Sequence, residues 1–242
     1  MEFFEVVKKR RSVRSFKTDP VPEGTVEKIL DTARWAMSGA NGQPWEFVVV
    51  TDRETKEKIA EVYVEHNRKR VYGIEQTRDK DMRHPMFRSS YSNPPGWKDA
   101  PVLIAVCGDQ RTFQATALAA HFFNGEGGPM GTYLKNMGNT TQLICLSAAA
   151  LGLGAQWVSV NLAWERRVKA ILDVPDDLLI HSLVPVGYPT YEPSSPYRRD
   201  LDELVHYGKY DRSRYRTDED IHEFILRLRK RTKAGYEKVV SE

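Results

Sequence analysis

The sequence predicts an α+β or α/β sandwich in which helices pack against one central sheet. Four short, apolar segments rich in β-branched residues have the character of strands, and helical stretches separate them. The chain of 242 residues is long enough to bury a sizeable core, and we expect one large domain rather than two small ones. The predicted strands are WEFVVVTD (45–52), APVLIAVCGD (100–109), GAQWVSVNL (154–162) and IHSLVPVGYP (180–189).

Two helices are predicted before the first strand. Residues 2–10 are mostly good helix formers, with Phe3, Val6 and Val7 at helical spacing. The second helix begins with Pro22 and ends at Gly39, because proline favours the first turn and glycine favours the residue after the last turn. Its apolar residues recur at intervals of three and four, at Val26, Ile29, Leu30 and Ala33.

The segments around the strands carry two further expectations. The strand over 45–52 is continuously apolar before Asp52, which is typical of an inner strand covered on both faces. Between Lys135 and Glu165 no residue is charged, but polar residues are scattered through this stretch, so we predict a deeply buried helix followed by a buried strand rather than a membrane span. These polar residues are Asn136, Asn139, Thr140, Thr141, Gln142, Ser147, Gln156, Ser159 and Asn161.

Two segments lie outside this predicted core. Residues 65–98 are rich in charge and show weak periodicity, and their aromatic residues favour a functional cover over a plain surface insertion. Those aromatic residues are Tyr72, Phe87, Tyr91 and Trp97. We predict one domain over 1–210 that contains this excursion, and a C-terminal helical arm over 211–242. A helix over about 217–233 would place Ile221, Phe224, Ile225 and Leu228 along one stripe.

Charge and cysteine content limit the class of protein. The 36 basic and 33 acidic residues give a net charge of +3, which provides no support for a nucleic-acid or membrane partner. Cys107 and Cys145 each lie in an apolar run and are predicted to be small buried hydrophobes in a reducing compartment. No secretory signal is predicted in MEFFEVVKKR, so we expect a cytoplasmic protein.

Several common catalytic motifs are absent. No GxGxxG motif follows a strand, and GxxxxGK[ST] does not occur, which disfavours a Rossmann dinucleotide site and a P-loop. The six histidines have no HExxH spacing and no cysteine pair joins them, so no metal site is predicted. GxSxG is absent too. The Gly-rich NGEGGPMG (124–131) is predicted to be a loop that opens a helix near Thr132.

The segment RRSVRSF (10–16) is the first candidate binding element. Arginine suits phosphate because its planar guanidinium donates two parallel, charge-assisted hydrogen bonds, and serine adds a directional donor. Arg10, Arg11, Ser12 and Arg14 on one turn could therefore enclose a phosphate, with the basic pair at 198–199 closing the pocket. A solvated basic face at a helix end is the alternative.

The segment SGANGQPWEF (38–47) is the second candidate. Its small residues and amides would allow a flat heterocycle to approach closely while its edge is hydrogen-bonded. A helix C-cap followed by a turn is the alternative interpretation. The residues concerned are Ser38, Gly39, Ala40, Asn41 and Gln43.

Four motifs occur in one order and spacing: RRSVRSF, SGANGQPWEFVVV, GLGAQWVSV and LVPVGYP. Together they resemble the nitroreductase-like flavin superfamily from about residue 8 to about residue 205, and their wording is especially similar to the iodotyrosine deiodinase branch. The resemblance implies an α+β fold with three layers, α/β/α, in an intertwined homodimer. It also implies that FMN binds at two sites in the dimer interface and that both chains contact each flavin.

The resemblance also implies roles for individual residues. Arg10, Arg11, Ser12 and Arg14 would hold the phosphate, the ribityl chain and the pyrimidine edge of FMN. Arg198 matches the late phosphate-binding basic residue of the family, and Arg199 is the adjacent option. Ser38, Gly39 and Ala40 would come from the partner chain. Val158, Ser159 and Val160 align with the strand end that faces the flavin N5, and the hydroxyl of Ser159 is the candidate donor there.

These implications predict an FMN-dependent oxidoreductase. Hydride would pass from NAD(P)H through FMN to a small electron-poor aromatic or quinone-like acceptor in a ping-pong reaction. No side chain of the shared motifs is expected to act as an indispensable acid or base, because the flavin carries the hydride chemistry. Two alternatives are a reductive dehalogenase of a halogenated phenol or tyrosine-like compound, and a non-catalytic protein that binds or stores flavin.

Overall fold

The structure is a computed structural model that describes residues 2–67, 74, 77–79, 94–112, 115 and 128–228. Internal contacts divide the chain into two compact units, Met1–Pro193 and Ser194–Glu242. We predicted that the cofactor-binding domain extends to residue 210. This boundary stays a prediction. Tyr72, Phe87 and Tyr91 of the expected cover lie outside the described residues.

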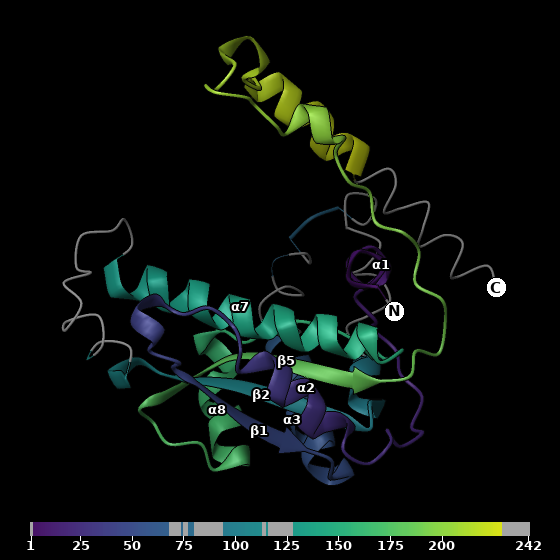
Figure 1. The fold of residues 1–242 in the computed structure, drawn as a ribbon. Coiled ribbons are helices and arrows are strands. Elements are labelled where there is room, and N and C mark those ends of the chain that lie inside the picture. Colours follow the sequence, from purple (N-terminus) through teal and green to yellow (C-terminus); the bar gives the residue numbers. More distant parts are fainter. Residues whose placement is uncertain are drawn as a thin grey trace. The chain divides into compact units, whose positions relative to one another are not determined.

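The first unit is built on one antiparallel sheet (Figure 1). Its strands follow the order β1-β2-β5-β3, and β4 also pairs with β5. All four predicted strands are present, and the third is divided into β3 and β4. The strands are β1 (Trp45–Val50), β2 (Val102–Asp109), β3 (Gly154–Ala155), β4 (Val158–Ser159) and β5 (Leu178–Gly187).

Strand β1 corrects one expectation, because it lies at an edge of the sheet rather than inside it. Within the described chain β1 pairs with β2 alone, and Val49 is 40% exposed. Trp45 and Val50 are buried at the two ends of β1, while the four residues between them are half-buried or exposed. A buried face and a paired edge are separate properties, and the sequence pattern reports the face.

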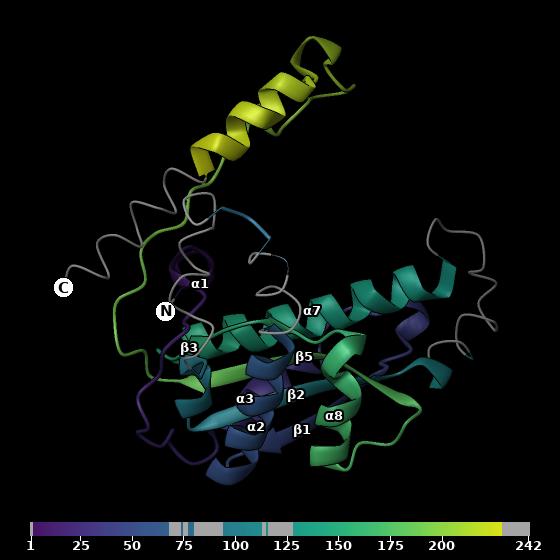
Figure 2. The ribbon, with the colours of Figure 1, turned by 180° about the vertical axis from the view of Figure 1, so that it is seen from behind.

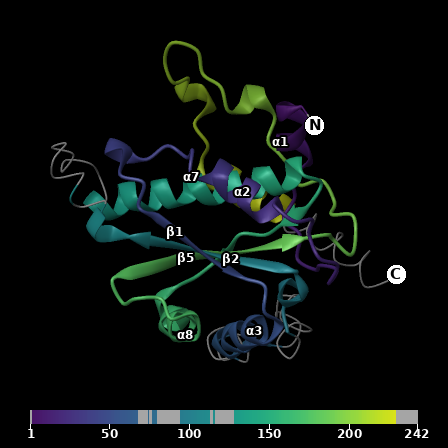
Figure 3. The ribbon, with the colours of Figure 1, turned by 60° about the horizontal axis from the view of Figure 1, so that its bottom comes forward.

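Helices cover both faces of the sheet, which confirms the three-layer α/β/α fold (Figure 3). Helices α2 (Thr25–Ala33) and α7 (Gly128–Ala150) lie on one face, and α3 (Arg53–Asn67) and α8 (Leu162–Leu172) lie on the other. Side chains of β2 alternate between these layers, as strand geometry requires. Val102, Ile104 and Val106 pack toward α2 and α7, whereas Leu103, Ala105 and Cys107 pack toward α3 and α8.

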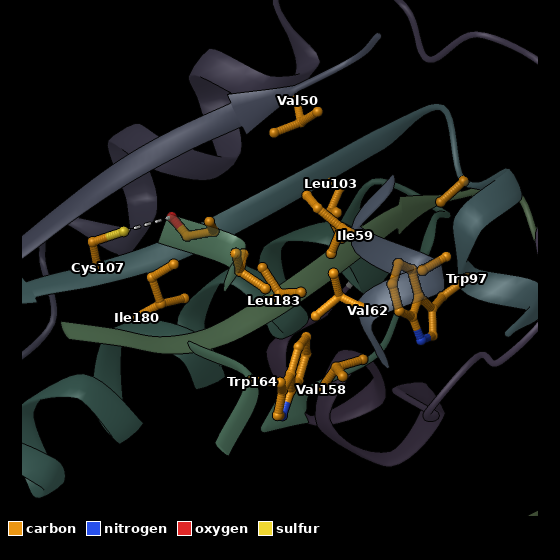
Figure 4. Packing of buried hydrophobic residues seen from close by; sticks show 14 of the residues in the cluster. Val50, Ile59, Val62, Trp97, Leu103, Cys107, Val158, Trp164, Ile180 and Leu183 are labelled. Atoms are coloured by element: carbon orange, nitrogen blue, oxygen red, sulfur yellow. Dashed lines mark hydrogen bonds between the residues drawn. The ribbon is translucent and has the colours of Figure 1, made fainter. Parts of the chain in front are cut away.

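The core beneath α3 and α8 contains a group of aromatic side chains (Figure 4). The ring of Tyr63 meets Trp97 edge-on at 5.6 Å and Trp164 at 5.5 Å between centroids. Trp97 is 2% exposed and lies in the short helix η4 (Gly96–Asp99). Trp97 is therefore a core residue, and its assignment to the functional cover is wrong. An aromatic residue in a polar stretch indicates that its side chain is buried. The sequence does not show whether it is buried in the core or under a functional cover.

The helices differ from their predicted bounds. The first helix, α1 (Phe3–Lys9), agrees with its predicted range, but α2 ends at Ala33, before the predicted Gly39. Helix α7 begins at Gly128 rather than near Thr132. Its burial is one-sided, because Met137 is fully buried while Leu134 is 48% exposed, so the single chain leaves one face of this helix open. In the described ranges no helix combines the length and apolarity needed to cross a bilayer.

Both cysteines are buried and unoxidised, as predicted. Burial raises the pKa of the Cys107 thiol to about 12 and that of the Cys145 thiol to about 11. Thiols that hold their protons this strongly are poor nucleophiles at neutral pH. The two side chains therefore act as small core residues.

The described part of the second unit, residues 194–228, contains two short helices and one longer one. They are η5 (Leu201–Glu203), η6 (Arg212–Arg214) and a helix over the described residues 218–228. The rings of Tyr197 and Phe224 lie 6.2 Å apart, and the Arg216 guanidinium lies 4.6 Å from the Phe224 ring centroid. Ile221 and Ile225 of the predicted stripe are 42% and 41% exposed.

Candidate functional site

The arginine-rich segment follows the end of α1 and runs beside β3. Ser12 forms a parallel bridge with Ala155, and the Val13 N–H donates to the Ala155 carbonyl at 3.0 Å. Val13 and Phe16 are each 3% exposed, so two apolar anchors fix the segment against the sheet. The Arg14 side chain is exposed, because strand-like alternation directs it away from the face that buries Val13.

The arginines of this segment have different roles. The Arg11 guanidinium donates to the carbonyls of Lys8 and Arg10 at the C-terminal end of α1, where it satisfies acceptors that the helix leaves open. Arg10 and Arg14 have no carboxylate within 4.0 Å among the described residues, and the Arg14 guanidinium makes one long contact of 3.5 Å to the Ser12 carbonyl. Arg10 and Arg14 are therefore the two cations that this segment can offer to an anion.

The loop over 38–43 has an unusual backbone. It contains the short helix η1 (Gly39–Asn41), in which φ is 52° at Ala40 and 53° at Asn41, and φ is 43° at Gln43. Left-handed conformations cost non-glycine residues roughly 1–2 kcal/mol each and persist where surrounding contacts enforce them. Three such residues within four positions mark this loop as a functional candidate.

Polar side chains of α7 hold this loop in place. The Gly39 N–H donates to Asn136 Oδ1 at 3.2 Å, and Asn139 Nδ2 donates to the Met37 carbonyl at 3.0 Å. One turn further on, Thr140 Oγ1 donates to the carbonyl of the last α2 residue at 3.0 Å. The spacing of these polar residues in the uncharged part of α7 after Lys135 is a signal of this role in the sequence, where we interpreted them as evidence against a membrane span.

The two predicted halves of the site contact α7 at different points along its length (Figures 1 and 2). The loop contacts α7 at Asn136, whereas Arg10 is close enough to Cys145 for its charge to oppose the rise of that thiol pKa. These two contact points are nine helical residues apart, or about 14 Å along the axis. Figure 2 shows α1 and β3 together at the C-terminal end of α7. A single chain thus keeps the two halves apart.

Of the three residues predicted to face the flavin N5, one presents its side chain to solvent. Ser159 is exposed, while Val158 is 6% exposed and belongs to the core on the α3 and α8 face (Figure 4). Val160 packs against the same core. Val158 and Val160 can therefore contribute backbone groups, and Ser159 can contribute a hydroxyl.

The basic pair at 198–199 belongs to the second unit. Arg199 forms an ion pair with Glu203 at 2.9 Å and also donates to its carbonyl at 3.1 Å. Arg198 donates to the Tyr197 carbonyl at 2.9 Å and has no carboxylate within 4.0 Å in the described part of the chain. Of the two options left by the sequence, Arg198 is the one with a guanidinium available to an anion.

A buried polar group beside β4 escaped the sequence analysis. His181 occupies the irregularity where the β2–β5 register shifts, and its ring meets Trp157 edge-on at 5.5 Å. Burial lowers the pKa of His181, so the ring is neutral at physiological pH. Within the part of the chain that the structure describes, the buried atoms His181 Nε2 and Gln156 Oε1 have no hydrogen-bond partner. A lone histidine in a strand gave no signal of this arrangement.

Comparisons with known proteins were made against this geometry. A model described as the nitroreductase family matches residues 7–188, which is more than half of the chain. A protein of Methanothermobacter thermautotrophicus that carries the provisional name NADH dehydrogenase/NAD(P)H nitroreductase is 30% identical over 214 residues, covering 87% of this chain and 88% of the relative. Iodotyrosine deiodinase 1 of Homo sapiens is 29% identical over 217 residues, covering 84% of this chain and 68% of the relative.

The fold is also similar to that of solved structures. A crystal structure of oxidised iodotyrosine deiodinase bound to FMN and 3-iodo-L-tyrosine superposes with a TM-score of 0.65 at 22% identity, covering 86% of this chain and 100% of that chain. The matched range contains the arginine-rich segment, the strained loop and all five strands. The chain therefore belongs to the nitroreductase family.

Proposed function

We propose that the protein is an FMN-dependent oxidoreductase. The observation that carries this proposal is the pair of guanidinium groups of Arg10 and Arg14, which the described chain leaves without a carboxylate partner. The donor set fits a phosphate monoester, because two guanidiniums and the Ser12 hydroxyl supply charge-assisted and directional hydrogen bonds. The FMN-bound deiodinase structure supports FMN as the mononucleotide. Bound FMN would supply hydride transfer between two substrates.

The residues of this chain would then bind and orient the cofactor. Arg10 and Arg14 neutralise the phosphate and Ser12 adds a neutral donor. The role that the resemblance implies for Arg198 stays a prediction, and Arg199 suits it less because it is paired with Glu203. The Ser159 hydroxyl is the proposed donor toward the flavin N5, where a donor tunes the balance between one-electron and two-electron chemistry.

A homodimer is part of the proposal. The separation of about 14 Å along α7 between the Asn136 and Cys145 contact points supports a site in which the 38–43 loop comes from a second copy. The open face of α7 supports the same arrangement, because Met130 and Leu134 are 44% and 48% exposed. Homodimer interfaces are more apolar than ordinary surfaces, which these side chains would suit.

The proposed reaction takes hydride from NADH or NADPH and delivers it to a small electron-poor aromatic or quinone-like acceptor. The name of the archaeal relative supports this assignment. Reductive dehalogenation of a halogenated phenol is the second candidate, and the identity of 29% with iodotyrosine deiodinase 1 favours it specifically. Cytoplasmic location stays a prediction.

Replacement of the two arginines tests the cofactor proposal. Each charge-assisted hydrogen bond is worth about 1.5–3 kcal/mol, so the Arg10→Gln/Arg14→Gln double variant should bind FMN at least about a hundredfold more weakly. Flavin fluorescence titration measures this affinity. Arg34→Gln is the matched control, because Arg34 is an exposed arginine of the same unit that is paired with Asp31 at 2.7 Å. Full FMN loading of the double variant would refute the proposal.

Anaerobic reoxidation separates the two reactions. The flavoprotein is reduced with NADH or NADPH and mixed with a nitroaromatic, a quinone or a halophenol, and flavin absorbance and halide release are followed. Rapid reoxidation by the nitroaromatic or quinone without halide release supports the first candidate. Stoichiometric halide release from the halophenol, with slow reoxidation by the other two, supports the second.

A further inference from the structure

A cavity lies outside the residues assigned to the flavin site. Its volume is about 530 Å³, within the range of small-molecule sites. It is formed where the chain after the arginine-rich segment, the end of β1, the first turn of α3 and the chain from η4 into β2 meet. The lining residues are Thr18, Pro20, Val21, Thr51, Arg53, Lys56, Lys98, Asp99, Pro101 and Val102.

One lining residue of this cavity, Lys56, carries a buried ammonium group. Lys56 is 5% exposed, and its Nζ donates to the Ala100 carbonyl at 2.6 Å and to the Pro101 carbonyl at 3.2 Å. An ammonium has three N–H donors, so two neutral acceptors leave one donor and the whole charge without a counterion. No carboxylate lies within 4.0 Å of Lys56 Nζ in the described part of the chain. A buried ammonium without a counterion is costly.

The burial of Lys56 has a measurable electrostatic effect. Removal from water lowers the pKa of Lys56, and the charge of Arg53 acts in the same direction. The carboxylates of Asp52 and Asp99 oppose this change without cancelling it. An anion bound in the cavity would stabilise the charged form of Lys56.

Two further cations and two hydroxyl residues line the walls. Arg53 and Lys98 enter from different elements, with Thr18 and Thr51 as neutral donors. Lys98 Nζ lies 2.6 Å from Asp99 Oδ1, and Asp99 also lines the cavity. The lining thus carries three positive charges and one negative charge. Arg53 is paired at 2.8 Å with Glu57, which lies outside the lining.

The remaining wall is apolar. Pro20, Val21, Pro101 and Val102 contribute this surface, and they offer room for a hydrocarbon or aromatic body beside a charged head. Hydroxyl, ammonium and guanidinium donors together suit a tetrahedral oxyanion, which can accept several hydrogen bonds at once. The donor set and the apolar wall together describe an anion-binding site.

We propose that this cavity binds a phosphoryl group, either as inorganic phosphate or as a small phosphate monoester whose body lies on the apolar wall. Lys56, Lys98 and Arg53 supply the charge, and Thr18 and Thr51 supply neutral donors. None of the lining residues belongs to the proposed flavin site, so this inference does not depend on the proposed function.

Equilibrium dialysis of radiolabelled inorganic phosphate against the FMN-saturated full-length protein tests the proposal. The protein is loaded with one FMN per chain and free FMN is removed, so the Arg10 and Arg14 site is filled while no free phosphate monoester competes for the cavity. One further phosphate per chain is expected, with Kd at or below about 1 mM. Arg53→Gln and Lys98→Gln should each weaken phosphate binding about tenfold or more, because each removes a charge-assisted hydrogen bond. These two variants avoid replacement of Lys56, which the fold itself uses.

Two controls separate this site from other causes. Lys58→Gln should leave phosphate affinity unchanged, because Lys58 lies on the same helix, is paired with Glu54 at 2.7 Å and does not line the cavity. The Arg10→Gln/Arg14→Gln variant should retain the phosphate site even when it cannot hold FMN. If that variant binds FMN normally, the proposed function fails while the cavity proposal stands.

The source of the phosphoryl group follows from a competition arm. Phenyl phosphate and unlabelled inorganic phosphate each compete with the labelled phosphate. If phenyl phosphate displaces the label at the lower concentration, the site binds a monoester. If the two are equally potent, the site binds inorganic phosphate. Absence of saturable binding in the FMN-saturated protein would overturn the proposal. So would loss of phosphate binding in the Arg10→Gln/Arg14→Gln variant, or full affinity in both Arg53→Gln and Lys98→Gln.

Discussion

Gly154 is the position at which a single methyl group should disturb the proposed site for the FMN phosphate at Arg10 and Arg14. A Cβ on Gly154 would lie 2.5 Å from Val13 Cγ2 and 2.9 Å from Val13 Cβ. Ordinary carbon contacts lie at about 3.5–4.0 Å, so Gly154→Ala requires a displacement of about 1 Å between the two segments. Both segments are held by the Val13 N–H bond to the Ala155 carbonyl at 3.0 Å, and the side chain cannot simply rotate away.

The expected cost of Gly154→Ala is that of overpacking a core, about 1–3 kcal/mol in the free energy of unfolding. For a chain of this size each kcal/mol lowers Tm by about 2–4 °C. The same displacement moves Ser12 and Arg14, which flank Val13. Because a charge-assisted hydrogen bond is worth about 1.5–3 kcal/mol, its loss should weaken FMN binding about tenfold or more.

A double-mutant cycle with Val13→Ala separates the steric cause from a general weakening of β3. Val13→Ala removes the two Cγ atoms that the new Cβ would approach, so the double variant should lose less stability than the sum of the single variants by about 0.5–2 kcal/mol. Urea unfolding of the three variants and the wild type measures the four free energies. Strict additivity, or wild-type stability of Gly154→Ala, would refute the proposed contact.

Three further predictions concern single groups. Ala40→Gly should raise the free energy of unfolding by up to about 1 kcal/mol, since glycine accepts the left-handed φ of 52° without strain, and a lower Tm would contradict this. The Arg111 guanidinium holds the pKa of Asp109 down to about 2, from the ordinary 3.8, so Arg111→Gln should be less stable than the wild type above pH 3.8. That difference should vanish as pH falls through about 2, because protonation of Asp109 removes the interaction in both proteins, and urea unfolding from pH 6 downward measures it. Ellman's reagent at pH 8 should label Cys107 and Cys145 slowly in the native protein and rapidly in guanidinium chloride, and fast native labelling of both would contradict their burial.

The layers and strands of this fold could be predicted from the sequence because they follow from local patterns. Strand β2 has no polar side chain from Val102 to Gly108, which indicates burial on both faces, and the alternation of its side chains between two cores confirms this. The same pattern gave the wrong place for β1. Only Trp45 and Val50 of this run are buried, and the position of β1 at the sheet edge depends on which strands pair across the whole chain.

The candidate site could be predicted in part. Arginine and serine content singled out the 10–16 segment, but the sequence did not distinguish Arg11, which caps α1, from Arg10 and Arg14. That distinction depends on where α1 ends. The strain of the 38–43 loop was also hidden, because it arises from contacts with Asn136 almost a hundred residues away in the chain.

The distance along α7 between Asn136 and Cys145 has a consequence for how the chain tolerates changes in length. A helix fixes the separation of its contact points through its number of residues, and one inserted turn adds about 5.4 Å. Lengthening α7 between Asn136 and Cys145 would therefore move the strained loop away from Arg10 and Arg14, the proposed phosphate ligands, by that amount. Extra residues placed after Pro193, where the first compact unit ends, leave this spacing unchanged.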